Sequence, residues 1–520
     1  MTGNVARNTK FILVFFGGIF LFGLLLLLTS HSRAKGRLEA GRKALVAAGE
    51  VLDIESLVPA LAQGESNGAD DLLDAAQAFS KIEPFLQPPS MRMLSHGRAL
   101  LSSGVKVLPN QKSREWTTNV WVDLEPVIEP YREQALSAMA AVTNDRILVE
   151  LDFAQGWNIL LPHLSKFRNM TAWMGVAVSY DLRHEEFPSA YTNLLTASRI
   201  TAKWRDGPFI IAQLVRQAMF RSLVAPLWEL LQHDQWSDAQ LEVLQRAWSE
   251  QEFWSGMERA FQMERATGLD TFERMLRDPN YMKGTGMDGY PKFVVKAAGE
   301  GIEELFRSPR KGMKKLFVEV PGLAAWPWIT VYDDQLWYLE HSQHNIDAVR
   351  VGMRSNSVAA AKSVYAGKSP VTIPEHYWFS RKMLPALGKA IDRTGEIEAI
   401  RALCVTAIAL KRFIRRNAGY PKDLKELVPD YLSQIPIDAM DGLPLRYRLE
   451  FDGRYSLWSI GKDGRDDGGD GSADIRLPDW SNCPDLLWPW PADPGEVEAY
   501  IVDLLRARVN GTPPGGPLVK

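Results

Sequence analysis

The stretch EIEAIRALCVTAIALKRFIRR, from Glu396 to Arg416, decides most about the fold of the C-terminal part of this chain. Apolar side chains recur along it at helical spacing, on one face and in a row beside that face: Ile397, Ile400, Cys404 and Ile408, with Leu403, Ala407, Leu410 and Ile414. An apolar stripe of this width predicts a long helix that is buried against other parts of the protein.

Two short stretches downstream of this helix alternate apolar and polar residues. They run from Leu445 to Leu449 and from Tyr455 to Ile460, and Asp452-Gly453 between them is a turn signal. This pattern predicts two antiparallel strands joined by a tight turn. We therefore expect a small antiparallel sheet that is covered by the long helix.

An acidic, glycine-rich loop follows the second strand, with the sequence DGRDDGGDGSAD from Asp463 to Asp474. Calcium binds about six to eight oxygen atoms from carboxylates and backbone carbonyls. The loop offers five carboxylates on a backbone that glycine makes adaptable. Asp463 and Asp470 are the best candidate ligands, Asp466 and Asp474 come next, and Asp485 lies outside the loop. A solvated acidic loop is the alternative interpretation, and composition alone favours it.

A series of short motifs accompanies the helix, the strands and the loop in a fixed order. They are Gly419-Tyr-Pro, Leu427-Val-Pro-Asp-Tyr-Leu, Pro436-Ile-Asp, Gly442-Leu-Pro-Leu-Arg-Tyr-Arg, Tyr455-Ser-Leu-Trp-Ser-Ile-Gly-Lys-Asp-Gly and Gly471-Ser-Ala-Asp-Ile. This order resembles the C-terminal domain of the major pseudopilin of type II secretion systems, over about residues 396–480. The resemblance implies that the acidic loop binds calcium and that the module works outside the cytoplasm.

The N-terminal pattern of the pseudopilin family is not found in this chain. Pseudopilins carry a leader that ends in glycine, then a phenylalanine and a glutamate at the start of an apolar helix that continues into the globular domain. We therefore expect neither processing by prepilin peptidase nor incorporation into a pseudopilus. The rest of the chain resembles, more loosely, uncharacterised bacterial membrane-anchored proteins, and that likeness implies no activity.

An apolar run near the N-terminus reads FILVFFGGIFLFGLLLLL from Phe11 to Leu28 and contains no charged residue. At about 1.5 Å per residue it nearly spans a hydrocarbon core of roughly 30 Å. A cleaved signal peptide is the alternative, but its apolar region is typically only about 7–15 residues long. The run therefore predicts a single-pass transmembrane helix that anchors the body to a membrane.

The orientation of this anchor is indicated by two patterns that disagree. Two basic residues precede the apolar run and five follow it closely: Arg7 and Lys10, then Arg33, Lys35, Arg37, Arg42 and Lys43. By the positive-inside rule this excess places the body in the cytoplasm. The pseudopilin resemblance favours export, and we give it more weight. We therefore expect a bacterial inner-membrane protein with its body in the periplasm.

The middle of the chain is dominated by helical periodicity. Apolar residues recur at helical spacing from Leu124 to Arg274, which predicts a stacked array of antiparallel helices. Ser237, with Gln240 three positions later, forms a capping-box pattern that predicts a helix start before Leu241. Frequent glycine and proline from Tyr281 to Pro327 indicate loops.

The predicted fold class is mainly α: one N-terminal transmembrane helix, a helical array as the body, and a small C-terminal α+β pseudopilin-like domain with a long helix on an antiparallel sheet. The expected segments are a short tail (1–10), the transmembrane helix (11–29), a helical membrane-proximal region (30–123), the helical array (124–275), a loop-rich region with further helices (276–395), the pseudopilin-like calcium-binding domain (396–495) and a C-terminal helix and tail (496–520).

Composition limits the classes of partner and of covalent cross-link. The net charge of -3 gives no basic excess for binding the phosphate backbone, so nucleic acid is not an expected partner. Two cysteines, Cys404 and Cys483, are too few for a disulfide framework. In an oxidising compartment they allow a single disulfide bond, which we expect only if their Cα atoms lie within about 7 Å.

No catalytic motif stands out in the sequence. His341-x-x-His344 does not match the spacing of a zinc hydrolase, and its histidines are better read as helix-surface residues. The carboxylate pairs Asp333-Asp334 and Glu303-Glu304 lie near aromatic residues, a composition that a glycan-cleaving site could use: Trp326, Trp328, Tyr332 and Trp337. The leading hypothesis is a non-enzymatic binding or scaffold protein with envelope or secretion proteins as partners. The alternative is an envelope hydrolase with its site in this middle region.

Overall fold

A computed structural model of the protein describes residues 25, 28–81, 88–102, 124–278, 281, 303–304, 307–314, 330–364, 373–374, 377–383, 387–472 and 479–510. The described chain is mainly helical and also contains two small sheets. A helix over residues 28–47 comes first. The other helices are α2 (Ala69–Ala78), α3 (Glu125–Ile128), α4 (Arg132–Ala141), α5 (His163–Arg183), α6 (Phe187–Lys203), α7 (Ile210–Ser222), α8 (Val224–Leu230), α9 (Asp238–Ser249), α10 (Trp254–Arg277), α12 (Pro309–Lys314), α15 (Val331–Ser355), α16 (Val358–Ser363), α17 (Trp378–Met383), α18 (Leu387–Arg416) and α19 (Pro494–Asn510).

Each sheet has three short strands. The strands are β1 (Ser90–Ser95), β2 (Arg98–Ser102), β3 (Arg446–Leu449), β4 (Tyr455–Ser459), β5 (Leu486–Leu487) and β6 (Trp490–Pro491). One sheet has the order β3-β4-β5, and all its pairs are antiparallel. The other has the order β1-β2-β6, in which β1 and β2 form an antiparallel hairpin and β2 pairs with β6 in parallel. The second sheet therefore joins residues from opposite ends of the chain.

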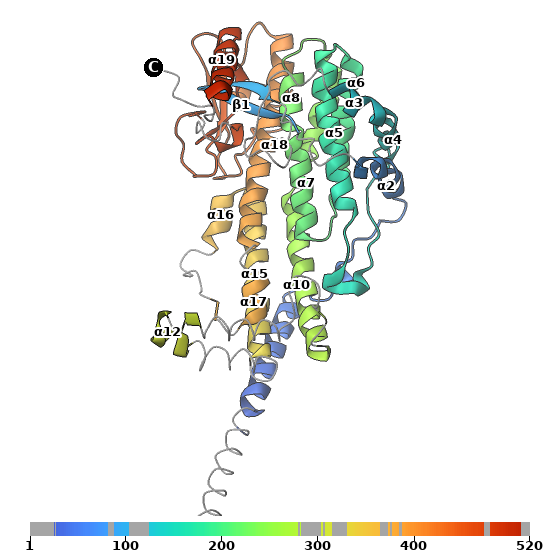
Figure 1. Ribbon diagram of the computed structural model, residues 1–520, viewed down its shortest axis with the longest axis vertical. Coiled ribbons are helices and arrows are strands. Elements are labelled where there is room, and N and C mark those ends of the chain that lie inside the picture. Colours follow the sequence, from blue (N-terminus) through green and yellow to red (C-terminus); the bar gives the residue numbers. More distant parts are fainter. Residues whose placement is uncertain are drawn as a thin grey trace, which may run out of the picture.

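The long helices run along the longest axis of the molecule (Figure 1). The helix over residues 28–47 lies at one end of this axis, near α17, and both sheets with α19 lie at the other end. Two ion pairs hold the N-terminal helix against the bundle: Arg37 with Asp333 at 2.6 Å and Arg42 with Glu273 at 3.1 Å. The acidic loop and the N-terminal helix are therefore far apart in the fold.

Helices α10 and α15 approach each other closely because a glycine faces an aromatic ring. A Cβ atom at Gly268 of α10 would lie 2.2 Å from the hydroxyl oxygen of Tyr338 in α15. That hydroxyl donates a hydrogen bond to the backbone carbonyl of Glu264 at 2.8 Å. No side chain fits at this position, so glycine lets Tyr338 be fully enclosed between the two helices.

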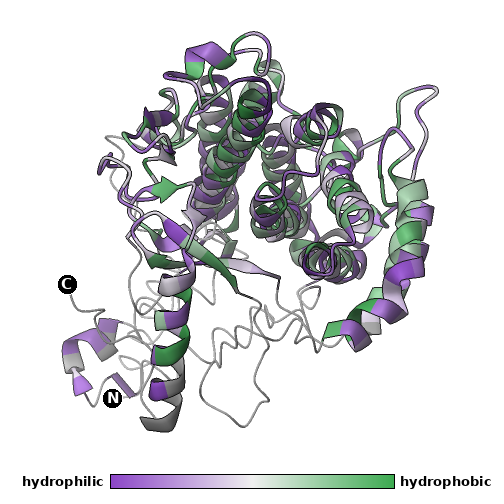
Figure 2. Cartoon of the chain, turned by 90° about the horizontal axis from the view of Figure 1, so that it is seen from above, coloured by the Kyte–Doolittle hydropathy of each residue, from purple (hydrophilic) through white to green (hydrophobic). Residues whose placement is uncertain are grey.

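The predicted long helix lies within α18, which begins nine residues earlier than expected. Every residue of its apolar stripe except Ile414 is buried. The stripe belongs to a hydrophobic cluster that extends from Ala69 of α2 to Trp488 beside the terminal sheets. Figure 2 looks along the long axis and shows the bundle helices nearly end-on, with both hydrophobic and hydrophilic residues on them. The C-terminal elements thus share a core with the helical array.

Two local predictions are confirmed. Ser237 caps α9 through a capping box with Gln240, as the sequence pattern indicated. The predicted hairpin is present as β3 and β4, with Arg446 opposite Trp458 and Leu449 opposite Tyr455.

The predicted membrane architecture is wrong. None of the helices within the described ranges is both long and apolar enough to cross a bilayer. The assigned span, Phe11 to Leu28, lies outside the described residues apart from Leu25 and Leu28. Helices α10 and α15 each bury apolar side chains and also carry charged residues, such as Glu273 and Asp333, as amphipathic helices do. The fold class is therefore corrected to a mainly helical chain with two small sheets.

The predicted location depended on the same span. An inner-membrane protein with its body in the periplasm requires an anchor, and the described part of the structure supplies no membrane-spanning helix. That assignment is corrected together with the fold class.

The two cysteines are not bonded to each other. Cys404 and Cys483 are both free and both buried. Burial raises the pKa of the Cys483 thiol to about 12 and also raises the pKa of Cys404, so neither is a reactive thiolate at neutral pH. Their placement in one module did not bring them into bonding contact.

Candidate functional site

The acidic loop leaves β4 and makes a series of tight turns. Gly468 and Gly469 have φ angles of 75° and 86°, in the left-handed region that glycine adopts without a steric penalty. These two glycines therefore allow the loop backbone to turn sharply before Asp470.

Asp485 holds this backbone in place, although it was expected to lie outside the loop. Its Oδ2 atom accepts hydrogen bonds from the backbone N–H groups of Gly469 at 2.7 Å and Asp470 at 2.9 Å. The side chain is fully buried, and its Oδ1 atom has no hydrogen-bond partner among the residues that the structure describes. Burial raises the pKa of Asp485. The sequence did not indicate this role of Asp485, because the backbone groups that it binds, at Gly469 and Asp470, are distant from it along the chain.

The predicted calcium ligands lie in the loop but do not converge. Asp463 is exposed and accepts a hydrogen bond from the backbone of Arg465 at 3.0 Å. The Oδ1 atom of Asp470 lies 3.5 Å from Nδ1 of His96, a residue in the turn of the β1–β2 hairpin. Asp474 lies outside the described residues. Within the described ranges, no group of three or more His, Cys, Asp or Glu side chains could hold a metal ion.

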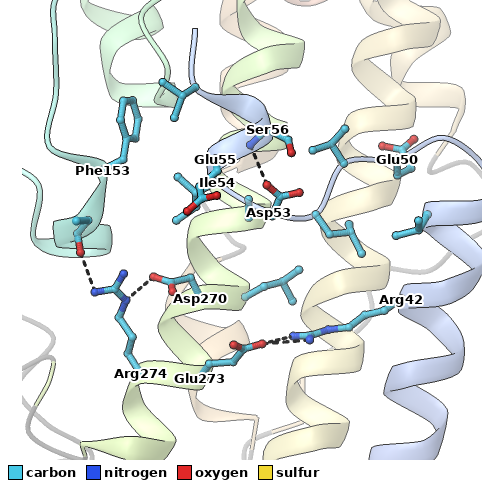
Figure 3. A pocket seen from close by; sticks show the side chains of 17 residues that line it. Arg42, Glu50, Asp53, Ile54, Glu55, Ser56, Phe153, Asp270, Glu273 and Arg274 are labelled. Carbon is cyan, nitrogen blue, oxygen red and sulfur yellow. Dashed lines mark hydrogen bonds and ion pairs between the residues drawn. The ribbon is translucent and has the colours of Figure 1, made fainter.

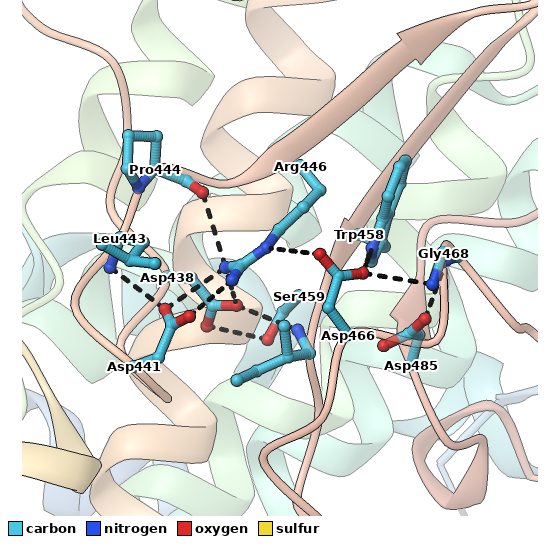
Figure 4. A network of polar contacts seen from close by, with 12 residues as sticks. Asp438, Asp441, Leu443, Pro444, Arg446, Trp458, Ser459, Asp466, Gly468 and Asp485 are labelled. Atoms are coloured by element: carbon cyan, nitrogen blue, oxygen red, sulfur yellow. Dashed lines mark hydrogen bonds and ion pairs between the residues drawn. The ribbon is translucent and has the colours of Figure 1, made fainter.

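Asp466, the remaining predicted ligand, belongs to a network around Arg446 (Figure 4). Its Oδ1 atom accepts a hydrogen bond from Nε1 of Trp458 at 2.9 Å, and this bond lowers the pKa of its carboxyl group. Its Oδ2 atom lies 3.3 Å from Nε of Arg446, which also pairs with Asp438 at 3.0 Å and with Asp441. Arg446 therefore neutralises part of the acidic charge.

Asp438 is the buried centre of this network (Figure 4). Its Oδ1 atom accepts hydrogen bonds from the backbone of Met440 at 3.0 Å and from the hydroxyl of Ser459 at 2.8 Å. Its Oδ2 atom accepts from the backbone of Ile460 at 2.9 Å and from Arg446 at 3.0 Å. Four donors thus fix one carboxylate, which ties the turn before β3 to the end of β4.

The loop lies at the junction of the two sheets. Asp485, which holds the loop, is followed directly by β5 in one sheet and then by β6 in the other. The backbone N–H of Trp490 donates to the carbonyl of Gly97 at 2.9 Å, in the same turn that carries His96. The β1–β2 hairpin, the acidic loop and the strands β5 and β6 therefore meet at one place.

A large pocket lies elsewhere, between the N-terminal helix, residues 50–58 and α10 (Figure 3). Its volume is about 890 Å³. Four of its five carboxylates make structural contacts: Asp270 pairs with Arg274 at 2.6 Å, Glu273 with Arg42 and Glu50 with Arg265, and Asp53 accepts from the backbone of Ser56 at 2.8 Å. The fifth, Glu55, is exposed. This pocket was not anticipated from the sequence.

Of the carboxylates suggested for a hydrolase, Asp333 and Asp334 have structural partners. Asp333 pairs with Arg37, and the buried Asp334 accepts hydrogen bonds from the backbone of Phe379 at 3.0 Å and Ser380 at 3.2 Å. Glu303 is exposed. The aromatic residues Trp326 and Trp328 lie outside the described residues.

The two histidines of the middle region lie on α15. The ring of His341 stacks on Trp337, with ring centroids 3.3 Å apart, and the ring centroid of His344 is 5.8 Å from that of His341. In the terminal module, Trp480 and Trp488 are buried in the shared core. These tryptophans seal the interior rather than present a surface for stacking on sugar.

Comparison with known proteins gives no match: no family model, no curated protein and no solved structure corresponds to this chain. The pseudopilin resemblance therefore rests on the sequence motifs alone.

Proposed function

We propose that the protein is a non-enzymatic binding or scaffold protein whose C-terminal end is a calcium-stabilised, pseudopilin-like module, and that its partners are secretion or envelope proteins. The observation that carries the proposal is the position of the acidic loop. Asp485 holds the loop backbone, and the residues that follow Asp485 belong to both sheets. A ligand that fixes the loop would therefore also fix the β1–β2 hairpin against the C-terminal pseudopilin-like module.

The donor groups of the loop are of the kind that calcium prefers. Asp463, Asp466 and Asp470 supply carboxylate oxygens, and Asp474 belongs to the same proposed ligand set. The buried Oδ1 atom of Asp485 is an oxygen without a hydrogen-bond partner among the described residues, directly beneath the loop backbone. Bound calcium would neutralise these charges, which otherwise repel one another.

Calcium is expected to raise the melting temperature of the full chain. At about a hundredfold excess over its dissociation constant, a ligand that binds only the folded state adds about 2.7 kcal/mol of stability. Thermal unfolding followed by circular dichroism, in calcium and in chelator, measures this effect. Asp463→Ala and Asp470→Ala should remove the calcium response.

Asp452→Ala is the matched control, because Asp452 is an exposed aspartate at the tip of the neighbouring β3–β4 hairpin. This variant should respond to calcium like the unaltered chain, whereas Asp485→Ala should respond less because the loop loses its anchor. Equal melting temperatures in calcium and in chelator would show that the loop is only a solvated turn.

The partner class is tested separately with purified major pseudopilin of a type II secretion system. Joint elution with the full chain from a sizing column in calcium, and separate elution in chelator, is the expected result. Separate elution under both conditions would contradict the secretion partner without affecting the calcium measurement.

A further inference from the structure

A second, smaller cavity lies near the start of α5, away from the acidic loop. It has a volume of about 400 Å³, within the range of small-molecule sites. Residues 58–61 and residues 147–151 form two parts of its lining. Most of the lining is apolar, including Ile147, Val149, Phe153 and Trp204.

His163, the first residue of α5, is the notable polar group in this wall. Only 3% of its surface is exposed, and its ring packs edge-on against Phe167 and Trp204, at centroid distances of 5.6 Å and 5.9 Å. Its ring nitrogens make no hydrogen bond to any residue that the structure describes. Because the ring lines the cavity, its hydrogen-bonding groups are available to a molecule inside.

The imidazole of His163 is neutral at physiological pH. Burial and the nearby Lys166 lower its pKa to about 4. A neutral imidazole offers one N–H donor and one acceptor lone pair, and it attracts neither cations nor anions strongly.

Two of the other polar side chains of the lining, Asp206 and Asn67, have protein partners, and the third, Glu150, is exposed to solvent. Asp206 is 9% exposed and pairs with Arg146 at 2.6 Å and with Arg259 at 3.1 Å. The side chain of Asn67 donates to the carbonyl of Leu148 at 2.9 Å and accepts from the N–H of the same residue. Apart from the exposed Glu150, the polar side chains of the lining are therefore neutral or paired, which suits an uncharged molecule.

The segment 58–61, which lines the cavity, is held by Arg146 and leaves apolar groups in solvent. Arg146 donates to the carbonyl of Ala60 at 2.9 Å and pairs with Glu65 at 3.1 Å. Val58 and Leu61, which also line the cavity, remain 38% and 37% exposed. A molecule in the cavity would remove part of this apolar surface from water.

We propose that this cavity, which we call the His163 cavity, binds a small, uncharged and mostly apolar molecule, oriented by a hydrogen bond to the imidazole of His163. The proposal does not depend on calcium or on the terminal module. It makes the helical body a carrier or sensor of such a molecule.

N-phenyl-1-naphthylamine is a suitable probe because it is uncharged, aromatic and carries one N–H group, and its fluorescence rises in apolar surroundings. The full chain should bind it at one saturable site. His163→Phe keeps a ring of similar size but removes the hydrogen bond, and should weaken binding about five- to tenfold. Val149→Phe should abolish binding by filling the cavity.

The matched control is His233→Phe. His233 also packs edge-on against an aromatic ring, that of Phe187 at 5.4 Å, but does not line the cavity. This variant should bind the probe like the unaltered chain. Absence of saturable binding, or equal losses in His163→Phe and His233→Phe, would overturn the proposal.

A second measurement does not require Val149→Phe, the variant that fills the cavity, to fold. The chain has eight histidines, which can be labelled with ¹³C at the ring and observed by NMR. Addition of the probe should shift chiefly the resonance that is missing in His163→Phe. A shift of other histidine resonances with this one unchanged would place the probe elsewhere and reject the site.

Discussion

Glu50→Ala is expected to destabilise the protein by about 3–5 kcal/mol, because it leaves a buried arginine without its counter-ion. The side chain of Arg265 is 0% exposed and lies 3.0 Å from the carboxylate of Glu50, which also pairs with Arg350. These contacts join the segment after the N-terminal helix to α10 and α15. Urea unfolding followed by circular dichroism measures the loss.

The pH dependence of this interaction has a definite sign. Burial acts to raise the pKa of Glu50, but hydrogen bonds from Arg350 and Arg265 outweigh it, and the net pKa is lowered. A carboxyl group whose pKa is lower in the folded state contributes its full stability above the unfolded value and loses it as the pH falls through the folded value. The difference between the unaltered chain and Glu50→Gln should therefore shrink below about pH 4.5.

Glu55→Ala is the control, since Glu55 is an exposed carboxylate on the same segment. It should leave the unfolding midpoint nearly unchanged. A similar loss in both variants would mean that removal of negative charge from the segment, rather than the buried pairing of Arg265, determines the effect.

Asp438→Asn is expected to cost about 3–5 kcal/mol, although the two side chains have nearly the same shape. The amide presents an NH₂ group to two of the four donors that the carboxylate now accepts, and Arg446 loses a buried partner. Unfolding monitored by circular dichroism measures the change.

Asp452→Asn makes the same chemical change at an exposed position of the same module and should unfold like the unaltered chain. If Asp438→Asn were as stable as this control, the network around Arg446 would contribute little to holding the turn before β3 against β4.

Features set by neighbouring residues were predictable from the sequence. The apolar stripe from Glu396 to Arg416, the turn at Asp452-Gly453 and the capping box at Ser237 each depend on contacts within a few positions, and each appears in the structure. Periodicity and capping are local properties of the backbone, so the pattern of residue types carries them directly.

Contacts between distant residues were not predictable in the same way. Asp485 was expected to lie outside the acidic loop because only its position in the sequence was known, and the structure places its carboxylate under the loop backbone. Asp334 was considered as half of a catalytic pair, whereas it accepts hydrogen bonds at the start of α17. Cys404 and Cys483 lie in one module without bonding. Sequence spacing does not determine which side chains meet across a shared core.

The apolar run at the N-terminus shows how far composition can predict structure. Its composition predicted an anchor, the pseudopilin resemblance then gave the compartment, and no described helix supports a membrane span. The metal assignment combined the number of carboxylates with the pseudopilin resemblance, and neither shows whether the carboxylates converge in space.

The parallel pairing of β2 with β6 has a consequence for how the chain is made. Arg98 and Ala99 find their partners in Trp490 and Pro491, about 390 residues later. On a ribosome that adds about 5–20 residues per second, the hairpin of β1 and β2 exists for roughly 20–80 seconds before its third strand is synthesised. Throughout that time one edge of β2 is open to strands of other chains, so a polypeptide that stops before Trp490 would keep a permanently unpaired edge near its beginning.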